Sequence, residues 1–132
     1  MGTPSEEKLL NRIQSYCPPG KINIIPAVNL RVLAGDLKKS RLFIGNDSGV
    51  MHLANMVGTP IVAIFGPGNV GTTGPYMAPK HYEILTENYS CSPCRQRFFK
   101  ECKPSPHNKP YCLEDITVKN VHEAIHRLLK RI

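Results

Sequence analysis

The sequence predicts an α/β fold, a Rossmann-like parallel sheet with helices on both faces. Short apolar segments of strand length alternate along the chain with segments whose apolar residues recur at helical spacing. The run Ile61 to Phe65 is apolar throughout and predicts a buried strand. A length of 132 residues suits one hydrophobic core, so we expect a single domain over 1–132.

The first helix is predicted at the very start of the chain. Thr3 is a suitable N-cap, Pro4 fits the first helical position, and Glu6 follows three residues after the cap. One apolar stripe continues to Cys17, which we expect to be buried at the helix end, before Pro18-Pro19-Gly20 stops the helix. A domain that opens on a capped helix has lost the strand that normally precedes it, so we expect truncation at the N-terminal side.

The rest of the chain repeats the alternation of strands and helices. We expect a strand over 22–25, a helix over 29–40, a strand over 41–45, a helix over 50–57, and strands over 61–65 and 82–85. This spacing favours parallel strands joined by helices. Residues 66–80 should form a long loop and residues 90–112 an irregular, cysteine-rich loop, and Thr117 should cap a final helix.

The composition is that of a folded, basic protein. Apolar residues make up 41% and charged residues 20%, and the net charge of +7 favours polyanionic partners: nucleic acid, anionic lipid or phosphorylated substrates. Four basic residues fall in the last helix, where cations also complement the helix dipole: His126, Arg127, Lys130 and Arg131. No apolar run is long enough to cross a bilayer and the amino terminus is polar, so we expect a cytoplasmic protein.

The turn between the strand at 41–45 and the next helix is a candidate phosphate-binding site. Ligands of open parallel sheets bind outside the carboxyl ends of the strands, and a helix N-terminus there offers N–H groups to an anion. Ser48 adds a hydroxyl donor, Gly49 allows close approach of the backbone, and the His52 ring can donate to a phosphate oxygen. The alternative is that Asp47 and Ser48 merely cap the helix.

The string from Asp47 to Ala54, followed by Gly58-Thr59-Pro60 and by a strand that ends in Phe65-Gly66-Pro67, closely resembles the signature of the family-nine glycosyltransferases. These are the ADP-heptose:lipopolysaccharide heptosyltransferases. Further segments also resemble the family, so that nearly the whole chain is covered: residues 2–7, 29–34, 91–94, 102 and 112–116.

The resemblance implies the arrangement called GT-B, in which two Rossmann-like domains face each other and the second binds the donor. This chain would be that C-terminal half. Asp47, Ser48, Gly49 and His52 would contact the phosphates and neighbouring sugar of the donor. Glu6 or Glu7 would bind the ribose and Val28 would flank the adenine, while Gly66 and Pro67 would belong to a loop near the donor.

The reaction implied by the resemblance transfers heptose from ADP-heptose to a hydroxyl of the lipopolysaccharide inner core, with inversion and without a required cofactor. It needs a general base for the acceptor hydroxyl and groups that stabilise the departing diphosphate. The family's base lies in the first domain, so we expect no catalytic residue in this chain and no activity from it alone. The missing domain would bind the acceptor, with peripheral association possible at the cytoplasmic face of the inner membrane.

Two other enzyme classes have partial patterns here. Residues 66–71 match G-x-G-x-x-G, but that fingerprint must open a helix, and Thr72 to Pro75 together with Pro79 argue against one. We therefore expect a loop that closes over the sugar side of the donor. A Ser-His-Asp hydrolase is excluded, because adjacent Asp47 and Ser48 cannot take the outer positions of a triad around one histidine.

Four cysteines form a separate pattern: Cys91, Cys94, Cys102 and Cys112. They could bind a structural zinc ion, form disulfides during handling or stay free thiols. Basic and aromatic residues surround them, which suggests a second hypothesis of a different class, a zinc-stabilised nucleic-acid-binding module. We favour a basic surface loop and expect no nucleic-acid partner, because that hypothesis leaves the strand, turn and helix signature unexplained.

Overall fold

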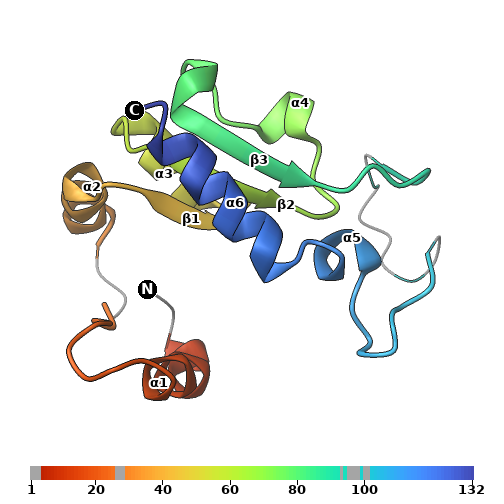
Figure 1. Ribbon diagram of the computed structural model, residues 1–132, viewed down its shortest axis with the longest axis horizontal. Coiled ribbons are helices and arrows are strands. Elements are labelled where there is room, and N and C mark those ends of the chain that lie inside the picture. The colour runs from red at the N-terminus through yellow and green to blue at the C-terminus, as the bar shows by residue number, and fades with distance from the viewer. Residues whose placement is uncertain (1–3, 26–28, 93, 95–98, 100–101) are drawn as a thin grey trace. The chain divides into compact units, whose positions relative to one another are not determined.

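The computed structural model describes residues 4–25, 29–92, 94, 99 and 102–132. The chain divides into two compact units, Met1–Gly35 and Asp36–Ile132, and each is described by itself. The second unit contains the sheet and most of the buried residues (Figure 1).

The first unit is a helical segment with exposed apolar side chains. It contains the short helix η1 (Pro4–Glu6) and the helix α1 (Glu7–Ser15). The predicted helix is confirmed over these residues, while its expected cap, Thr3, lies outside the described residues. Leu9 and Ile13 are 55% and 45% exposed. Cys17 is only half-buried, so the prediction of a buried helix-end residue was wrong.

The predicted strand over 22–25 is also wrong. These residues have no regular secondary structure, and the Ile22 carbonyl accepts a hydrogen bond from the Gln14 side chain at 3.0 Å. A strand needs a neighbouring strand for its backbone groups, and the described residues place none beside this segment. The next helix, α2 (Leu30–Lys39), begins after Asn29, whose side chain accepts from the Val32 N–H at 2.9 Å.

Three parallel strands form the sheet, in the order β1-β2-β3. Their bounds are Phe43–Asn46 for β1, Ile61–Phe65 for β2 and Tyr82–Thr86 for β3, and the helix α3 (Gly49–Met56) connects the first two. The three predicted strands and the helix between them are confirmed to within two residues at each end. Figure 1 shows the carboxyl ends of the strands at one edge of the sheet.

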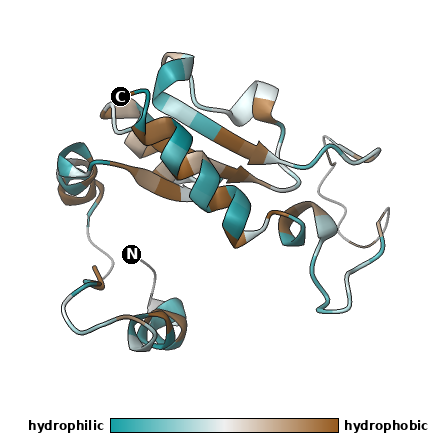
Figure 2. Cartoon of the chain, viewed as in Figure 1, coloured by the Kyte–Doolittle hydropathy of each residue, from teal (hydrophilic) through white to brown (hydrophobic). Residues whose placement is uncertain are grey.

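The central strand β2 is buried on both of its faces. On one face Val62 packs against Ala124 and Leu128 of the last helix, α6 (Val118–Leu129). On the other face Ile61 and Phe65 are fully buried as well. Figure 2 shows β2 in brown and an α6 with alternating teal and brown residues, as expected for a helix with one side on the sheet. The layered α/β fold predicted from the sequence is confirmed.

The last helix is fixed at both ends. Thr117 and Asn120 form a capping box at its start, which confirms the predicted cap. Near its end Arg127 donates to Glu83 Oε2 from Nε at 3.1 Å, and Arg131 donates to the other oxygen of the same carboxylate. Part of the basic C-terminal cluster therefore has a structural role. Within the described ranges, no helix has the length and apolar character needed to span a bilayer.

Regular structure also occurs where loops were predicted. The helix α4 (Val70–Thr73) and the short helix η2 (Pro79–His81) lie within the expected loop over 66–80, and α5 (Tyr111–Glu114) starts inside the cysteine-rich segment. The prediction that no helix follows the G-x-G-x-x-G string was therefore wrong. The Asn69 side chain caps α4 by accepting from the Gly71 N–H at 2.9 Å, and Gly74 ends it after one turn.

Candidate functional site

The predicted phosphate-binding turn lies at the carboxyl end of β1. Strand β1 ends at Asn46 and α3 begins at Gly49, so only Asp47 and Ser48 separate them. Ser48 has extended backbone angles, and its Oγ accepts a long hydrogen bond of 3.5 Å from the Met51 N–H. Ser48 therefore caps the helix, as one of the two predictions had it. A serine hydroxyl that accepts at a cap still has its own O–H to donate, so capping does not prevent contact with a ligand.

Asp47 does not act as a second cap. Its carboxylate turns toward the segment after β2, where the Thr73 hydroxyl donates to Asp47 Oδ2 at 2.9 Å. Its backbone N–H donates to the Ile64 carbonyl at 3.2 Å, next to the end of the neighbouring strand. The side chain keeps 26% of its surface exposed. Asp47 therefore sits between the ends of β1 and β2 with part of its carboxylate open to solvent.

His52 lies on the first turn of α3 and faces the same carboxylate. Its Nε2 is 3.9 Å from Asp47 Oδ1, too far for a hydrogen bond, and 43% of its side chain is exposed. The imidazole thus stays available to donate to a ligand. The structure brings together Asp47, Ser48, Gly49 and His52 as the sequence predicted.

The segment after β2 contributes residues that the sequence reasoning missed. A Cβ on Gly68 would lie 2.5 Å from Asp47 Oδ2, so a side chain there would displace the carboxylate. Gly68 and Thr73 are therefore the residues of this segment that meet Asp47. Gly66 and Pro67, the two residues predicted near the donor, directly follow β2. A Cβ on Gly66 would clash with Leu113 of α5, and Pro67 lines a pocket that also contains four cysteines. Their contact with the donor stays a prediction. The available signal was the glycine string 66–71, from which we expected a loop over the sugar side of the donor but assigned no role to Gly68 or Thr73.

The Gly58-Thr59-Pro60 part of the signature has a structural role. Gly58 ends α3 with a φ of 81°, a conformation that glycine adopts without strain. Thr59 is buried and its hydroxyl donates to the Leu37 carbonyl at 2.7 Å. These residues direct the chain from α3 into β2.

The residues predicted to bind the nucleoside belong to the first unit. Glu6 ends η1 and Glu7 begins α1, and both are exposed. Val28 lies outside the described residues. Their contacts with ribose and adenine stay predictions.

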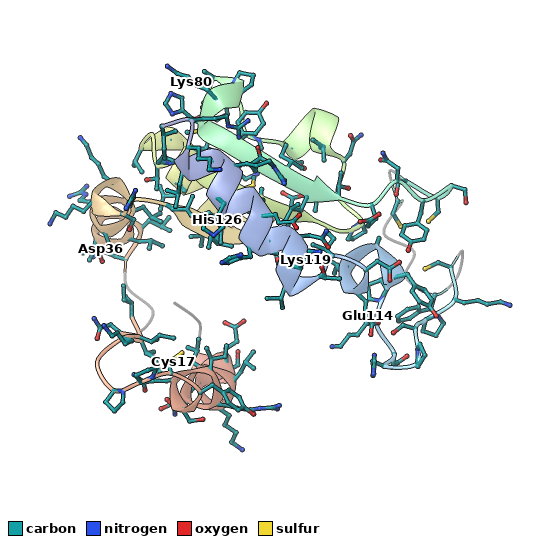
Figure 3. The ribbon with its side chains drawn as sticks, viewed as in Figure 1. Cys17, Asp36, Lys80, Glu114, Lys119 and His126 are labelled. Carbon is teal, nitrogen blue, oxygen red and sulfur yellow. The ribbon has the colours of Figure 1, made fainter. Side chains whose placement is uncertain are left out.

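The four cysteines of the 90–112 segment line one pocket of about 260 Å³, which we call the cysteine pocket. Its wall comprises Pro67, Tyr89, Ser90, Cys91, Ser92, Cys94, Cys102, Lys103, Pro110, Tyr111 and Cys112. Burial raises the pKa of the Cys112 thiol, and the negative charge of Cys91, Cys102 and Cys94 as thiolates raises it further. Figure 3 shows sulfur atoms in yellow on the segments around α5, where Glu114 is labelled. Among the described residues, no three His, Cys, Asp or Glu side chains are arranged to hold a metal ion.

Two polar contacts hold the segments beside the cysteine pocket. The Tyr89 hydroxyl donates to Asp115, and this hydrogen bond to a carboxylate is the main cause that raises the pKa of Tyr89 to about 12. Hydrogen bonds from Ser105 and His107 lower the pKa of Glu114. Glu114, the last residue of α5, and Asp115, directly after it, are therefore hydrogen-bonded to segments that precede the helix.

Comparison with protein families identifies the family of the chain. Residues 1–103 match the model described as glycosyltransferase family 9 (heptosyltransferase). The chain is 32% identical to lipooligosaccharide heptosyltransferase 2 of Campylobacter jejuni (strain NCTC 11168) over 96% of its length and 38% of the relative. It is 30% identical to lipopolysaccharide heptosyltransferase 1 of Pseudomonas aeruginosa over 70% of its length and 25% of the relative.

A solved structure has the same architecture. The glycosyl transferase family 9 protein of Veillonella parvula superposes with a TM-score of 0.73 at 29% identity, over 99% of this chain and 36% of that one. The chain thus spans between about a quarter and two fifths of the length of these relatives, and the turn around Asp47 lies within the matched residues.

Proposed function

This chain belongs to glycosyltransferase family 9, and we propose that it is the donor-binding half of a heptosyltransferase that transfers heptose from ADP-heptose to the lipopolysaccharide inner core. One observation carries the proposal. The N-terminus of α3, which lies at the carboxyl end of β1, presents Ser48, Gly49 and His52, and the Asp47 carboxylate lies beside them. That is where open parallel sheets bind phosphorylated ligands.

The turn contains both hydrogen-bond donors and an acceptor, and these favour different parts of a nucleotide sugar. The first N–H groups of α3, the Ser48 hydroxyl and the His52 ring are donors, which favours the diphosphate. The Asp47 carboxylate only accepts and would repel a phosphate, so it suits the hydroxyls of the neighbouring sugar. Asp47 and His52 would therefore bind at the junction between the diphosphate and the heptose.

In the transfer reaction this half would act on the leaving group. As the bond from the anomeric carbon to the diphosphate breaks, negative charge grows on the departing oxygen. Donors already placed by the fold stabilise that charge without reorganising. We propose that the general base and the acceptor-binding residues belong to a part of the protein outside this chain, that the chain alone binds donor without turnover, and that the transfer needs no cofactor.

The acceptor suggests where the protein works. The lipopolysaccharide core is an oligosaccharide attached to an anionic lipid, and the net charge of +7 would attract the chain to an anionic surface. We propose a cytoplasmic enzyme that associates peripherally with the inner membrane. The curated relatives named above act on lipopolysaccharide or lipooligosaccharide by their names, in agreement with this acceptor.

Calorimetric titration with ADP, ADP-heptose, UDP sugars and short oligonucleotides tests the proposal. We expect ADP-heptose to bind more tightly than ADP, and His52→Ala to weaken both by roughly tenfold, the loss of about 1.4 kcal/mol. His126→Ala, on the exposed side of α6, is the matched control and should change neither affinity. Preference for UDP sugars would assign another donor within the same fold, and binding of oligonucleotides alone would favour the nucleic-acid module instead.

A further inference from the structure

The cysteine pocket lies outside the donor turn and has no part in the proposed transfer. Four cysteines from three stretches of chain face this one pocket: Cys91 and Cys94, then Cys102, then Cys112 at the second position of α5. Chance would rarely place four of the five cysteines of a chain around one pocket of about 260 Å³.

We infer that the cysteine pocket is a binding site for a thiophilic divalent metal ion, with zinc as the ion that its four thiolates fit best. Zinc in structural sites takes four ligands in a tetrahedron, and four cysteines are one of its common ligand sets. The C-x-x-C pair supplies two ligands from one turn of chain, while Cys102 and Cys112 supply the other two. No such site follows from the proposed transfer, which requires no metal.

The side chains must move inward to reach the ion. No three of the described candidate ligands are arranged around a common point, so coordination would contract the pocket. Thiolate coordination of zinc is strong enough to fold peptides that are otherwise unfolded, and such sites rarely exist before the metal binds. Cys91, Cys94 and Cys102 belong to no helix or strand, whereas Cys112 is part of α5.

The surrounding charge suits the bound state. Four thiolates around a divalent ion leave a net negative charge, which raises the cost of the site unless cations lie near it. Lys103 lines the pocket and supplies one such cation.

A bound ion would tie together the segments that lead from β3 to α5 and α6. Cys91 and Cys94 follow β3, whereas Cys112 is part of α5. Leu113, the next residue, meets Gly66 at the end of β2. Metal binding would therefore hold the connecting loop against the carboxyl end of the sheet.

Metal analysis of the chain purified without chelator tests this inference. We expect roughly one equivalent of zinc per chain, and less than about a tenth of an equivalent in Cys91→Ser and Cys112→Ser. Cys17→Ser, which changes a cysteine of the first unit, is the matched control and should keep its zinc. Zinc lost equally in Cys17→Ser would place the metal elsewhere and overturn the inference.

Cobalt replacement gives a readout that does not depend on the folding of the variants. Addition of Co²⁺ to the wild-type chain, after removal of zinc, should produce the sulfur-to-metal charge-transfer absorption and the visible bands of tetrahedral thiolate coordination. The absence of both zinc and this spectrum would overturn the inference, as would a disulfide between two of the four cysteines in freshly purified protein. These measurements involve no nucleotide, so a negative result would overturn the metal site without affecting the proposed donor site.

Discussion

Thr73 donates its hydroxyl hydrogen to Asp47 Oδ2 over 2.9 Å, and this bond joins the segments that follow β1 and β2. The two residues are 26 positions apart in the chain, yet parallel strands bring their ends to the same edge of the sheet. With Oδ2 held by Thr73, Oδ1 is left facing His52. The bond therefore orients the carboxylate that we assign to the sugar of the donor.

Thr73→Val should weaken the binding of ADP-heptose. Valine keeps the branched shape but removes the hydroxyl, so the Asp47 carboxylate loses its fixed orientation. We expect a loss of about 1–2 kcal/mol in binding free energy, the worth of a hydrogen bond to a charged group, and a smaller change for ADP, which lacks the sugar. Calorimetric titration of both ligands measures the difference.

Thr73→Ser is the matched control, because it restores the hydroxyl and should restore most of the affinity. Equal weakening by valine and serine would show that the Thr73 hydroxyl alone does not account for the effect of this residue on binding. If the valine variant bound both ligands as tightly as the wild type does, Thr73 would have no role in donor binding.

Gly68→Ala should disturb the same carboxylate by a clash with its Oδ2 atom. The new Cβ would lie 2.5 Å from Asp47 Oδ2, so either the carboxylate or the loop must shift. We expect weaker binding of ADP-heptose together with a loss of stability of about 1–3 kcal/mol, as for other overpacked sites. Urea unfolding and calorimetric titration measure the two effects.

Gly35→Ala provides the control for the glycine itself. Gly35 lies inside α2, and a Cβ there meets no atom within 4 Å. Alanine should stabilise the helix by roughly 0.5–1 kcal/mol, since glycine is the poorer helix former. If Gly68→Ala also stabilised the chain, the contact between the new Cβ and Asp47 would not be the reason for a glycine at position 68.

The sequence predicted those parts of the fold that local patterns determine. The uninterrupted apolar run at 61–65 marks β2 because a strand buried on both faces needs no polar residue. Thr117 marks the start of α6 because its side chain satisfies a backbone donor of the first turn. The turn at Asp47 was found because a cap, a glycine and a histidine follow a strand directly.

The predictions that were wrong concern segments whose structure depends on contacts between residues far apart in the sequence. The apolar residues at 22–25 match a strand pattern, but a strand forms only where another strand can pair with it. Pro75 and Pro79 argued against a helix after β2. The helix α4 is nevertheless possible because it is a single turn, which the Asn69 side chain caps and which ends before Pro75. The partnership of Thr73 and Asp47 has no local signal, because it depends on the register of β1 and β2.

Glu83→Gln should destabilise the second unit by loosening α6. The Glu83 side chain is 14% exposed and its carboxylate binds both Arg127 and Arg131, whose side chains are 53% and 41% exposed. Because solvent screens the arginines in part, we expect a loss of about 1–2 kcal/mol in the free energy of unfolding, measured in urea at neutral pH. The loss should shrink in high salt.

Glu123→Gln is the matched control on the same helix. Its pair with Lys119 is long, at 4.0 Å, and the two side chains are 50% and 84% exposed. We expect this change to cost less than about 0.5 kcal/mol. Equal effects of the two glutamine variants would mean that the arginine pairs add no more than an ordinary surface ion pair.

Asp115→Asn should lower the pKa of Tyr89 from about 12 toward 10.0, because the hydrogen bond to the Asp115 carboxylate is the main cause of the rise. The folded chain holds the phenol proton more tightly than the unfolded chain does. The stability from this bond is therefore fully present below pH 10 and is lost as the pH rises from about 10 to about 12.

Absorbance of the phenolate during alkaline titration, taken as the difference between the wild type and Tyr89→Phe, isolates this residue. The difference curve should have its midpoint near pH 12 in the wild type. In the Asp115→Asn background, the same difference should have a midpoint near the ordinary value for tyrosine, about 10. Coincident midpoints in the two backgrounds would show that Asp115 does not hold the phenol proton, and the loop before the cysteine pocket would then need another contact to α5.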